Sequence, residues 1–142
     1  MNPGMVRRWS RWHRALYRAT GGRLGRRFVN ADILLLTTTG RKSGAKHTVP
    51  LIYLRDEDRV VVVASYAGRP DPPDWYKNLL ADPVVEVETP EGKWVGRART
   101  ADPDERAVWW PRAVAVYKPY ADYQTRTDRV IPIVFIEPVG ES

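Results

Sequence analysis

The sequence has no cysteine and only two histidines, His13 and His47, among its 142 residues. Without cysteine the chain can form no disulfide, no thiolate nucleophile and no cysteine-ligated metal site. The two histidines stand in different segments, which argues against a histidine-based zinc site. We therefore predict no metal site.

Long hydrophobic runs are also missing. No apolar stretch approaches the roughly 20 residues that cross a bilayer. Arg7 and Arg8 lead into no apolar segment of the kind found in secretory signals. We therefore expect a cytoplasmic protein. With 43% apolar residues, the chain is large enough for one core and too small to divide comfortably into two.

The common nucleotide-binding motifs, GxGxxG and GxxxxGK followed by Ser or Thr, are absent as well. Positive charge is concentrated at the start, where residues 1–31 hold eight arginines and no acidic residue. The rest of the chain holds fifteen Lys or Arg against seventeen Asp or Glu, a net charge of −2. Because the body of the domain has no basic excess, the composition argues against a nucleic-acid partner.

The first 22 residues are predicted to form a basic amphipathic helix, ahead of a single domain over residues 23–142. Its apolar side chains recur at a 4-3-4 spacing on one face, namely Met5, Trp9, Trp12 and Leu16. Arginines occupy the opposite face. Gly21 and Gly22 would end it. The helix could pack on the domain, close over an apolar pocket as a lid, or lie peripherally on an anionic membrane through residues 5–20. The sequence leaves these three interpretations open.

After this helix, strand patterns dominate the chain. The predicted strands cover residues 32–39, 47–54, 59–65, 84–89, 93–100 and 130–137. The third contains four consecutive valines and should be buried on both faces, whereas the fourth alternates Val and Glu and should be half exposed. Six strands in mostly antiparallel succession, with two helices inserted, predict a mainly β, α+β domain built as a closed or split barrel.

The first inserted helix is predicted over residues 74–81, with Asp74 as its N-cap and Asp82-Pro83 ending it. The segment 66–73 contains three prolines and a glycine and is predicted to be irregular. A polar loop rich in tyrosine is predicted over residues 118–129.

The second helix is predicted to begin at Asp102 or its neighbour and to run to about Tyr117. Pro103 would stand in its first turn, and Pro111 should bend or divide it. Three side chains would form its apolar stripe: Trp109, Ala113 and Val116.

The turn between the first two strands is the first candidate site. It reads Gly40-Arg41-Lys42-Ser43-Gly44, followed by Lys46 and His47. One interpretation is an ordinary solvated hairpin turn. The other is an anion-binding nest, in which glycine permits positive φ, backbone amides converge, and the cationic side chains add donors.

A second candidate group follows the most buried strand and crosses the Pro/Gly-rich segment, where loops on a rigid scaffold collect binding residues. Trp75 could wall a planar ring, with Lys77 and Asn78 bonding its edge; packing of a short helix is the alternative. Ser65 and Gly68 precede them. Ser65 is a candidate hydroxyl donor rather than a nucleophile, because no Ser-His-Asp arrangement is available.

A third group consists of tyrosines spaced three apart: Tyr117, Tyr120 and Tyr123. A tyrosine offers an apolar face and an acidic O–H, which suits an aromatic acceptor or the protonation of a reduced oxygen. Packing of a loop on the barrel is the alternative.

Together these segments resemble the deazaflavin-dependent nitroreductase family, which comprises F420H2-dependent quinone reductases with a split-barrel fold like that of flavin reductases and pyridoxamine oxidases. The similarity extends in order over roughly residues 32–138. It includes LLTTTGRKSG (35–44), VPL (49–51), VVAS (62–65), WYKNL (75–79), DP (82–83), WP (110–111), the tyrosines, TDR (127–129) and IPI (131–133).

The resemblance implies an oxidoreductase that uses coenzyme F420, a planar deazaflavin with a polyanionic tail. The implied cofactor-binding residues are Arg41, Lys42, Ser43, Gly44, His47, Pro50, Ile52, Ala64, Ser65, Gly68, Trp75 and Asn78. The implied catalytic residues, on the acceptor side, are Ser65, Tyr117, Tyr120 and Tyr123. The acceptor would be a lipid quinone such as menaquinone, or a nitroaromatic compound. An FMN-dependent split-barrel reductase or oxidase and a non-catalytic F420 or lipid carrier remain as alternatives.

Overall fold

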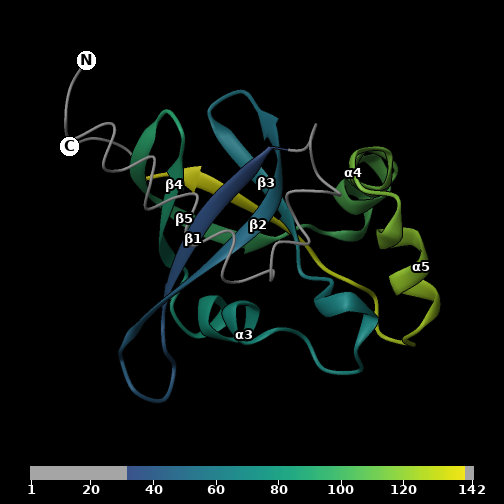
Figure 1. The fold of residues 1–142 in the computed structure, drawn as a ribbon, viewed down its shortest axis with the longest axis horizontal. Helices are drawn as coiled ribbons and strands as arrows, with labels where there is room; N and C mark the ends of the chain where they lie inside the picture. Colours follow the sequence, from purple (N-terminus) through teal and green to yellow (C-terminus); the bar gives the residue numbers. More distant parts are fainter. Residues whose placement is uncertain (1–31, 140–142) are drawn as a thin grey trace.

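A computed structural model of the chain describes residues 32–139, so the predicted N-terminal helix lies outside the described residues. Six antiparallel strands close into a barrel in the order β1-β2-β3-β6-β5-β4 (Figure 1). They are β1 (Ile33–Thr39), β2 (Lys46–Asp56), β3 (Arg59–Val63), β4 (Val84–Thr89), β5 (Gly92–Thr100) and β6 (Ile133–Pro138). The predicted six-stranded barrel is confirmed.

The last strand closes the barrel by inserting between β3 and β5. On one side Val61 lies opposite Phe135 in the register of β3 and β6, and on the other Ala98 of β5 lies opposite Ile136. This strand begins at Ile133, three residues later than predicted. Pro132 immediately precedes it and has no N–H to donate to a ladder.

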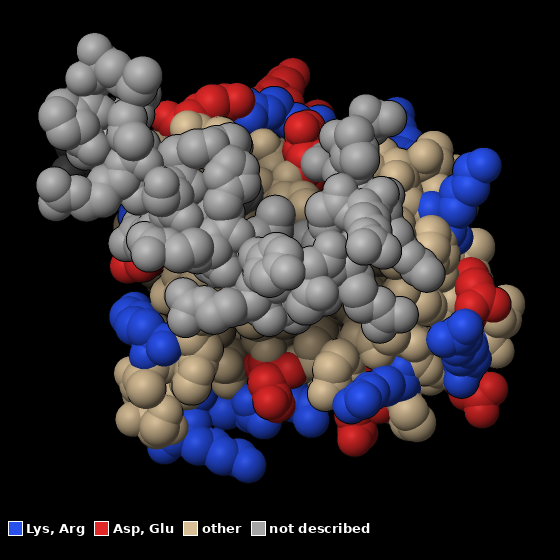
Figure 2. All heavy atoms as spheres, viewed as in Figure 1, with Lys and Arg blue, Asp and Glu red and all other residues tan. Residues whose placement is uncertain are grey.

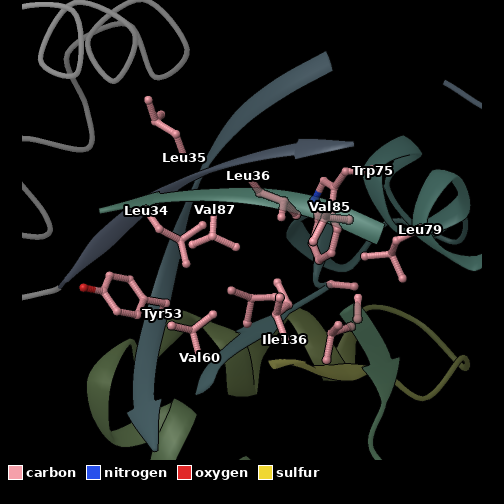
Figure 3. Packing of buried hydrophobic residues seen from close by; sticks show 14 residues of the cluster. Leu34, Leu35, Leu36, Tyr53, Val60, Trp75, Leu79, Val85, Val87 and Ile136 are labelled. Carbon is pink, nitrogen blue, oxygen red and sulfur yellow. The ribbon is translucent and has the colours of Figure 1, made fainter. Parts of the chain in front are cut away.

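Strand β3 is buried on both faces, as predicted. Val60 and Val62 belong to the barrel core, and Figure 3 shows Val60 in this core with Leu34, Leu36 and Ile136. The alternate residues of β3 belong to a second apolar layer outside the barrel. Because successive side chains of a strand point to opposite faces, β3 contributes residues to both apolar clusters. The prediction for β4 was wrong, because only its first residue is exposed and Glu88 and Thr89 are buried.

Helix α3 (Asp74–Ala81) lies at the end of the barrel where the β1–β2 hairpin projects (Figure 1). Its bounds match the prediction, but its N-cap is Pro73 rather than Asp74. Trp75 and Leu79 join the barrel core beside Val85 (Figure 3). A single 3-10 turn, η1 (Tyr66–Gly68), lies within the segment that was predicted to be irregular.

The outer layer is covered by α4 (Pro103–Val116) and α5 (Pro119–Thr125). Helix α4 starts with a capping box between Asp102 and Glu105. Pro111 does not divide α4, and the predicted apolar stripe fails at Val116, which is 42% exposed.

Helix α5 corrects the predicted loop over residues 118–129. Pro119 occupies its first turn, where a missing N–H is tolerated, and Tyr120 is buried in the outer layer. No helix within residues 32–139 combines the length and apolar character needed to span a membrane.

Candidate functional site

The candidate residues gather at one rim of the barrel. Strands β1 and β3 both pair antiparallel with β2, so both end at the same rim. The β1–β2 turn follows β1, the 65–69 segment follows β3, and α3 lies between them (Figure 1). Three segments that are distant in the sequence therefore meet at one place.

The β1–β2 turn is held by its own amides. Gly40 N–H donates to the Ala45 carbonyl at 2.7 Å and Gly44 N–H to the Gly40 carbonyl at 2.9 Å, while Ala45 N–H donates to Ser43 Oγ at 3.1 Å. Gly44 alone in this turn has a positive φ, of 74°. Because these amides bond within the turn, its capacity for an anion depends chiefly on the side chains of Arg41 and Lys42.

Asn78 of α3 anchors this turn. Its side-chain oxygen accepts hydrogen bonds from the Arg41 guanidinium at 2.7 Å and from the Arg41 backbone N–H at 3.2 Å. Its amide nitrogen donates to Thr38 Oγ1 at 3.3 Å. Asn78 and Thr38 are 4% and 1% exposed, so the bond between these two side chains is shielded from water, whereas the two bonds to Arg41 are part-buried. Asp74, one helical turn before Asn78, approaches the guanidinium at 3.4 Å from the exposed side.

The turn and α3 border an open cavity of about 390 Å³. Six predicted cofactor-binding residues line it: Arg41, Lys42, Ser43, His47, Trp75 and Asn78. Thr38, Gly40, Val49 and Asp74 complete the lining. Lys and Arg side chains lie at this edge of the molecule, at the lower left of the view in Figure 2, where Figure 1 places the β1–β2 hairpin. The cavity therefore combines several cations with the indole of Trp75.

The other predicted cofactor residues lie outside this lining. Pro50 and Ile52 are on β2, opposite Leu35 and Ile33 of β1, and Ile52 is buried. Ala64 is fully buried and its N–H donates to the Pro132 carbonyl at 2.9 Å. Gly44, Ser65 and Gly68 are likewise not among the residues that line this cavity.

The segment after β3 has an unusual backbone. Tyr66, Ala67 and Gly68 all have positive φ, of 46°, 54° and 74°. For the two residues with side chains this conformation costs about 1–2 kcal/mol each, so other contacts must hold it. At Gly68 a Cβ atom would lie 2.4 Å from the Tyr123 carbonyl oxygen, which shows how closely α5 approaches.

The side chain of Arg129 supplies contacts that hold the backbone of this segment. Arg129 was not singled out as a site residue from the sequence. Its guanidinium donates to the Ser65 carbonyl at 2.8 Å, the Arg69 carbonyl at 2.9 Å and the Ala64 carbonyl at 3.3 Å. Desolvation by burial lowers the pKa of Arg129. The only sequence signal was its place in the TDR segment.

The three tyrosines form one cluster. Tyr120 and Tyr123 lie on α5, and Tyr117 is the C-cap of α4. The Tyr117 and Tyr120 rings meet edge to face at 4.9 Å between centroids, and the hydroxyls of Tyr117 and Tyr123 are 3.0 Å apart. Tyr120 is 5% exposed, and desolvation raises its pKa above the ordinary value. Because the rings meet edge to face, the cluster can supply O–H donors and an apolar aromatic surface rather than a stack of parallel rings.

Comparison with known proteins gives consistent matches. A model of the family described as F420H(2)-dependent quinone reductase matches residues 9–138. The F420H(2)-dependent quinone reductase Rv1261c of Mycobacterium tuberculosis is 40% identical over 130 residues, which cover 89% of this chain and 87% of that protein.

Two solved structures are also similar. An F420-H2 dependent reductase, FDR-A, is 45% identical with a TM-score of 0.66, covering 75% of this chain and 94% of that chain. A chain described as a domain-swapped dimer is 39% identical with a TM-score of 0.67, covering 93% of this chain and 99% of that chain. The similarity in three dimensions supports the split-barrel fold that the sequence predicts.

Proposed function

The chain belongs to the F420H(2)-dependent quinone reductase family, and we propose that it is an oxidoreductase that reduces a quinone with reduced coenzyme F420. The observation that carries this proposal is the cationic cavity between the β1–β2 turn and α3, walled by Trp75. A polyanionic tail and a planar ring are the two features that such a lining suits.

The residues present fit the coenzyme. Arg41, Lys42 and His47 would hold the phosphodiester and glutamates of its tail. Lys46, the first residue of β2, would assist them. Trp75 and the start of β2 would lie along the ring. A compact FMN phosphate has less charge to match, so the extended cationic lining favours the deazaflavin over FMN.

The bound coenzyme supplies a hydride, which carries two electrons and one proton. The quinone needs one further proton to become a hydroquinone, so the protein must present a donor to the acceptor oxygen. Ser65 and one of Tyr117, Tyr120 and Tyr123 would provide it. A neutral O–H aimed at charge that develops during the transfer stabilises the transition state, and the aromatic cluster would exclude water around it.

The acceptor that we propose is a lipid quinone of the menaquinone type, and a nitroaromatic compound is a second possible acceptor. Tryptophan-bearing residues 5–20 would then guide an apolar quinone tail, either as a lid or at an anionic membrane surface.

Titration of the purified protein with F420 and with FMN, followed by tryptophan quenching, tests the cofactor. We expect F420 to bind more tightly than FMN, and a menaquinone analogue to oxidise the F420H2 complex. The double variant Arg41→Ala/Lys42→Ala should raise the Kd for F420 severalfold. Lys93→Ala/Arg97→Ala, two exposed cations of β5, is the matched control, and equal effects of the two pairs would contradict the proposed tail site. Binding without any oxidation would instead indicate a carrier.

A further inference from the structure

The segment that carries Ser65 is fixed at both of its ends by one side chain. Arg129 donates to the carbonyls of Ala64 and Ser65 on one side of the left-handed turn and to that of Arg69 on the other. A guanidinium is planar and has five N–H donors in a fixed geometry, so it can bridge carbonyls that a point charge cannot.

The guanidinium of Arg129 donates its hydrogen bonds to backbone carbonyls, and the carboxylate of Asp71 interacts with it through charge alone. Within residues 32–139, none of the ion pairs formed by arginine involves Arg129. Gln124 of α5 donates to its carbonyl oxygen at 2.8 Å, which links it to the helix that carries two of the tyrosines. The close approach of Gly68 to the Tyr123 carbonyl joins the same two segments a second time, and η1 lies beside α5 (Figure 1).

We propose that Arg129 is a positioning residue that sets the Ser65 hydroxyl relative to the tyrosine cluster by bridging the backbone on both sides of the left-handed turn. This inference rests on the function proposed above, in which Ser65 and a tyrosine act on the acceptor. Arg129 itself would touch neither the coenzyme nor the quinone.

A double-mutant cycle between Arg129→Lys and Ser65→Ala tests the proposal. Ser65→Ala removes the hydroxyl but keeps the carbonyl that Arg129 contacts, so each change is separate. If Arg129 acts through the hydroxyl, each single variant should lower kcat for a soluble quinone about a hundredfold, the lower end of what a positioned proton donor contributes. The double variant should then be no slower than the slower single variant. Losses that multiply would overturn the proposal.

Arg59→Lys is the matched control. Arg59 has a side chain 23% exposed that bonds to Asp56, and it lies at the opposite end of β3 from Ser65. We expect this variant to keep kcat and KM within about twofold even where it lowers Tm, as a surface ion pair would. A purely structural Arg129 would behave like Arg59, with a lower Tm and unchanged kcat.

Hydrogen exchange of the ligand-free protein gives a readout that does not depend on activity. Arg129→Lys should speed amide exchange in residues 65–69 and leave α3 protected, since loss of the bridge frees only that segment. Unchanged exchange there would contradict the proposal. If wild-type protein binds F420 but never oxidises F420H2, the proposed reaction fails while exchange still tests Arg129. If Arg129→Lys does not fold, Arg129→Gln takes its place in the same cycle and the same exchange measurement.

Discussion

Replacing Asn78 with alanine should destabilise the protein by disconnecting the β1–β2 turn from α3. Three hydrogen bonds disappear together: a charge-assisted one of 2.7 Å to the Arg41 guanidinium, one of 3.2 Å from the Arg41 N–H and one of 3.3 Å to Thr38. Losing a bond to a charged group costs about 1.5–3 kcal/mol, and a neutral one about 0.5–1.5 kcal/mol.

The two neutral bonds are long, so they belong at the lower end of that range. Water can reach the Arg41 side chain, which is 26% exposed, and will replace part of the loss there. The buried Thr38 hydroxyl, at 1% exposure, has no such access to water. We therefore expect Asn78→Ala to lower the free energy of unfolding by about 2–3 kcal/mol. For a domain of this size that corresponds to a fall in Tm of about 8–12 °C.

Urea unfolding followed by tryptophan fluorescence measures this change, and Leu80→Ala is the matched control because Leu80 is on the same helix and 61% exposed. Asn78→Asp should lose less stability than Asn78→Ala, since a carboxylate still accepts from Arg41 and only the donation to Thr38 is removed. A cycle with Arg41→Ala should give an interaction energy of about 1.5–3 kcal/mol. Equal stability of Asn78→Ala and Leu80→Ala, or a coupling near zero, would refute the reasoning.

Three further predictions concern other parts of the rim and the outer layer. Gly68 and Gly44 both have φ of 74°, but only Gly68 faces a backbone carbonyl of α5. Gly68→Ala should therefore lower the free energy of unfolding by at least about 2 kcal/mol more than Gly44→Ala does. Equal losses in urea unfolding would contradict this. The hydrogen bond from Arg99 lowers the pKa of Glu105 from its ordinary value of 4.5 to about 2. The stability that Glu105 contributes is therefore complete above pH 4.5 and lost as pH falls through about 2, and Glu105→Gln should remove this dependence from acid unfolding curves. Tyr120→Phe should lower turnover and leave F420 binding near the wild-type value, and unchanged turnover would exclude Tyr120 as a donor.

The strands could be predicted because their burial is encoded locally. Four valines at residues 60–63 require burial on both faces, and the hairpin signals around residues 40–44 fix the first register. Helix α3 could also be predicted, since prolines precede it and Asp82-Pro83 follows it. The candidate site at the β1–β2 turn could be predicted from glycines and cations that stand together in the sequence.

Helix α5 could not be predicted, because its sequence PYADYQT has little helix propensity. What favours the helix is the burial of Tyr120 against Trp110 and Ile131, a contact between segments that local patterns do not connect. Val116 is the last residue of α4 and is exposed, which periodicity within the helix alone does not indicate.

The polar contacts at the rim could not be predicted from the sequence for a different reason. Asn78 bonds to a residue 37 positions earlier and Arg129 to one 64 positions earlier, and a single sequence carries no sign of either pairing. The sequence suggested that Asn78 binds the coenzyme ring, whereas its side chain in this structure is engaged with Arg41 and Thr38. Its contribution to binding is thus expected to pass through Arg41.

These two contacts divide the proposed site into separate halves. Asn78 links α3 to the turn after β1, and Arg129 links α5 to the turn after β3, and the two networks have no hydrogen-bonding residue in common. Energetic effects at sites without shared partners usually add within about 0.5 kcal/mol. Asn78→Ala should therefore weaken F420 binding by the same factor whether residue 129 is Arg or Lys, and Arg129→Lys should slow turnover by the same factor with or without Asn78. Strong coupling between them would mean that the cofactor and acceptor sides move as one unit.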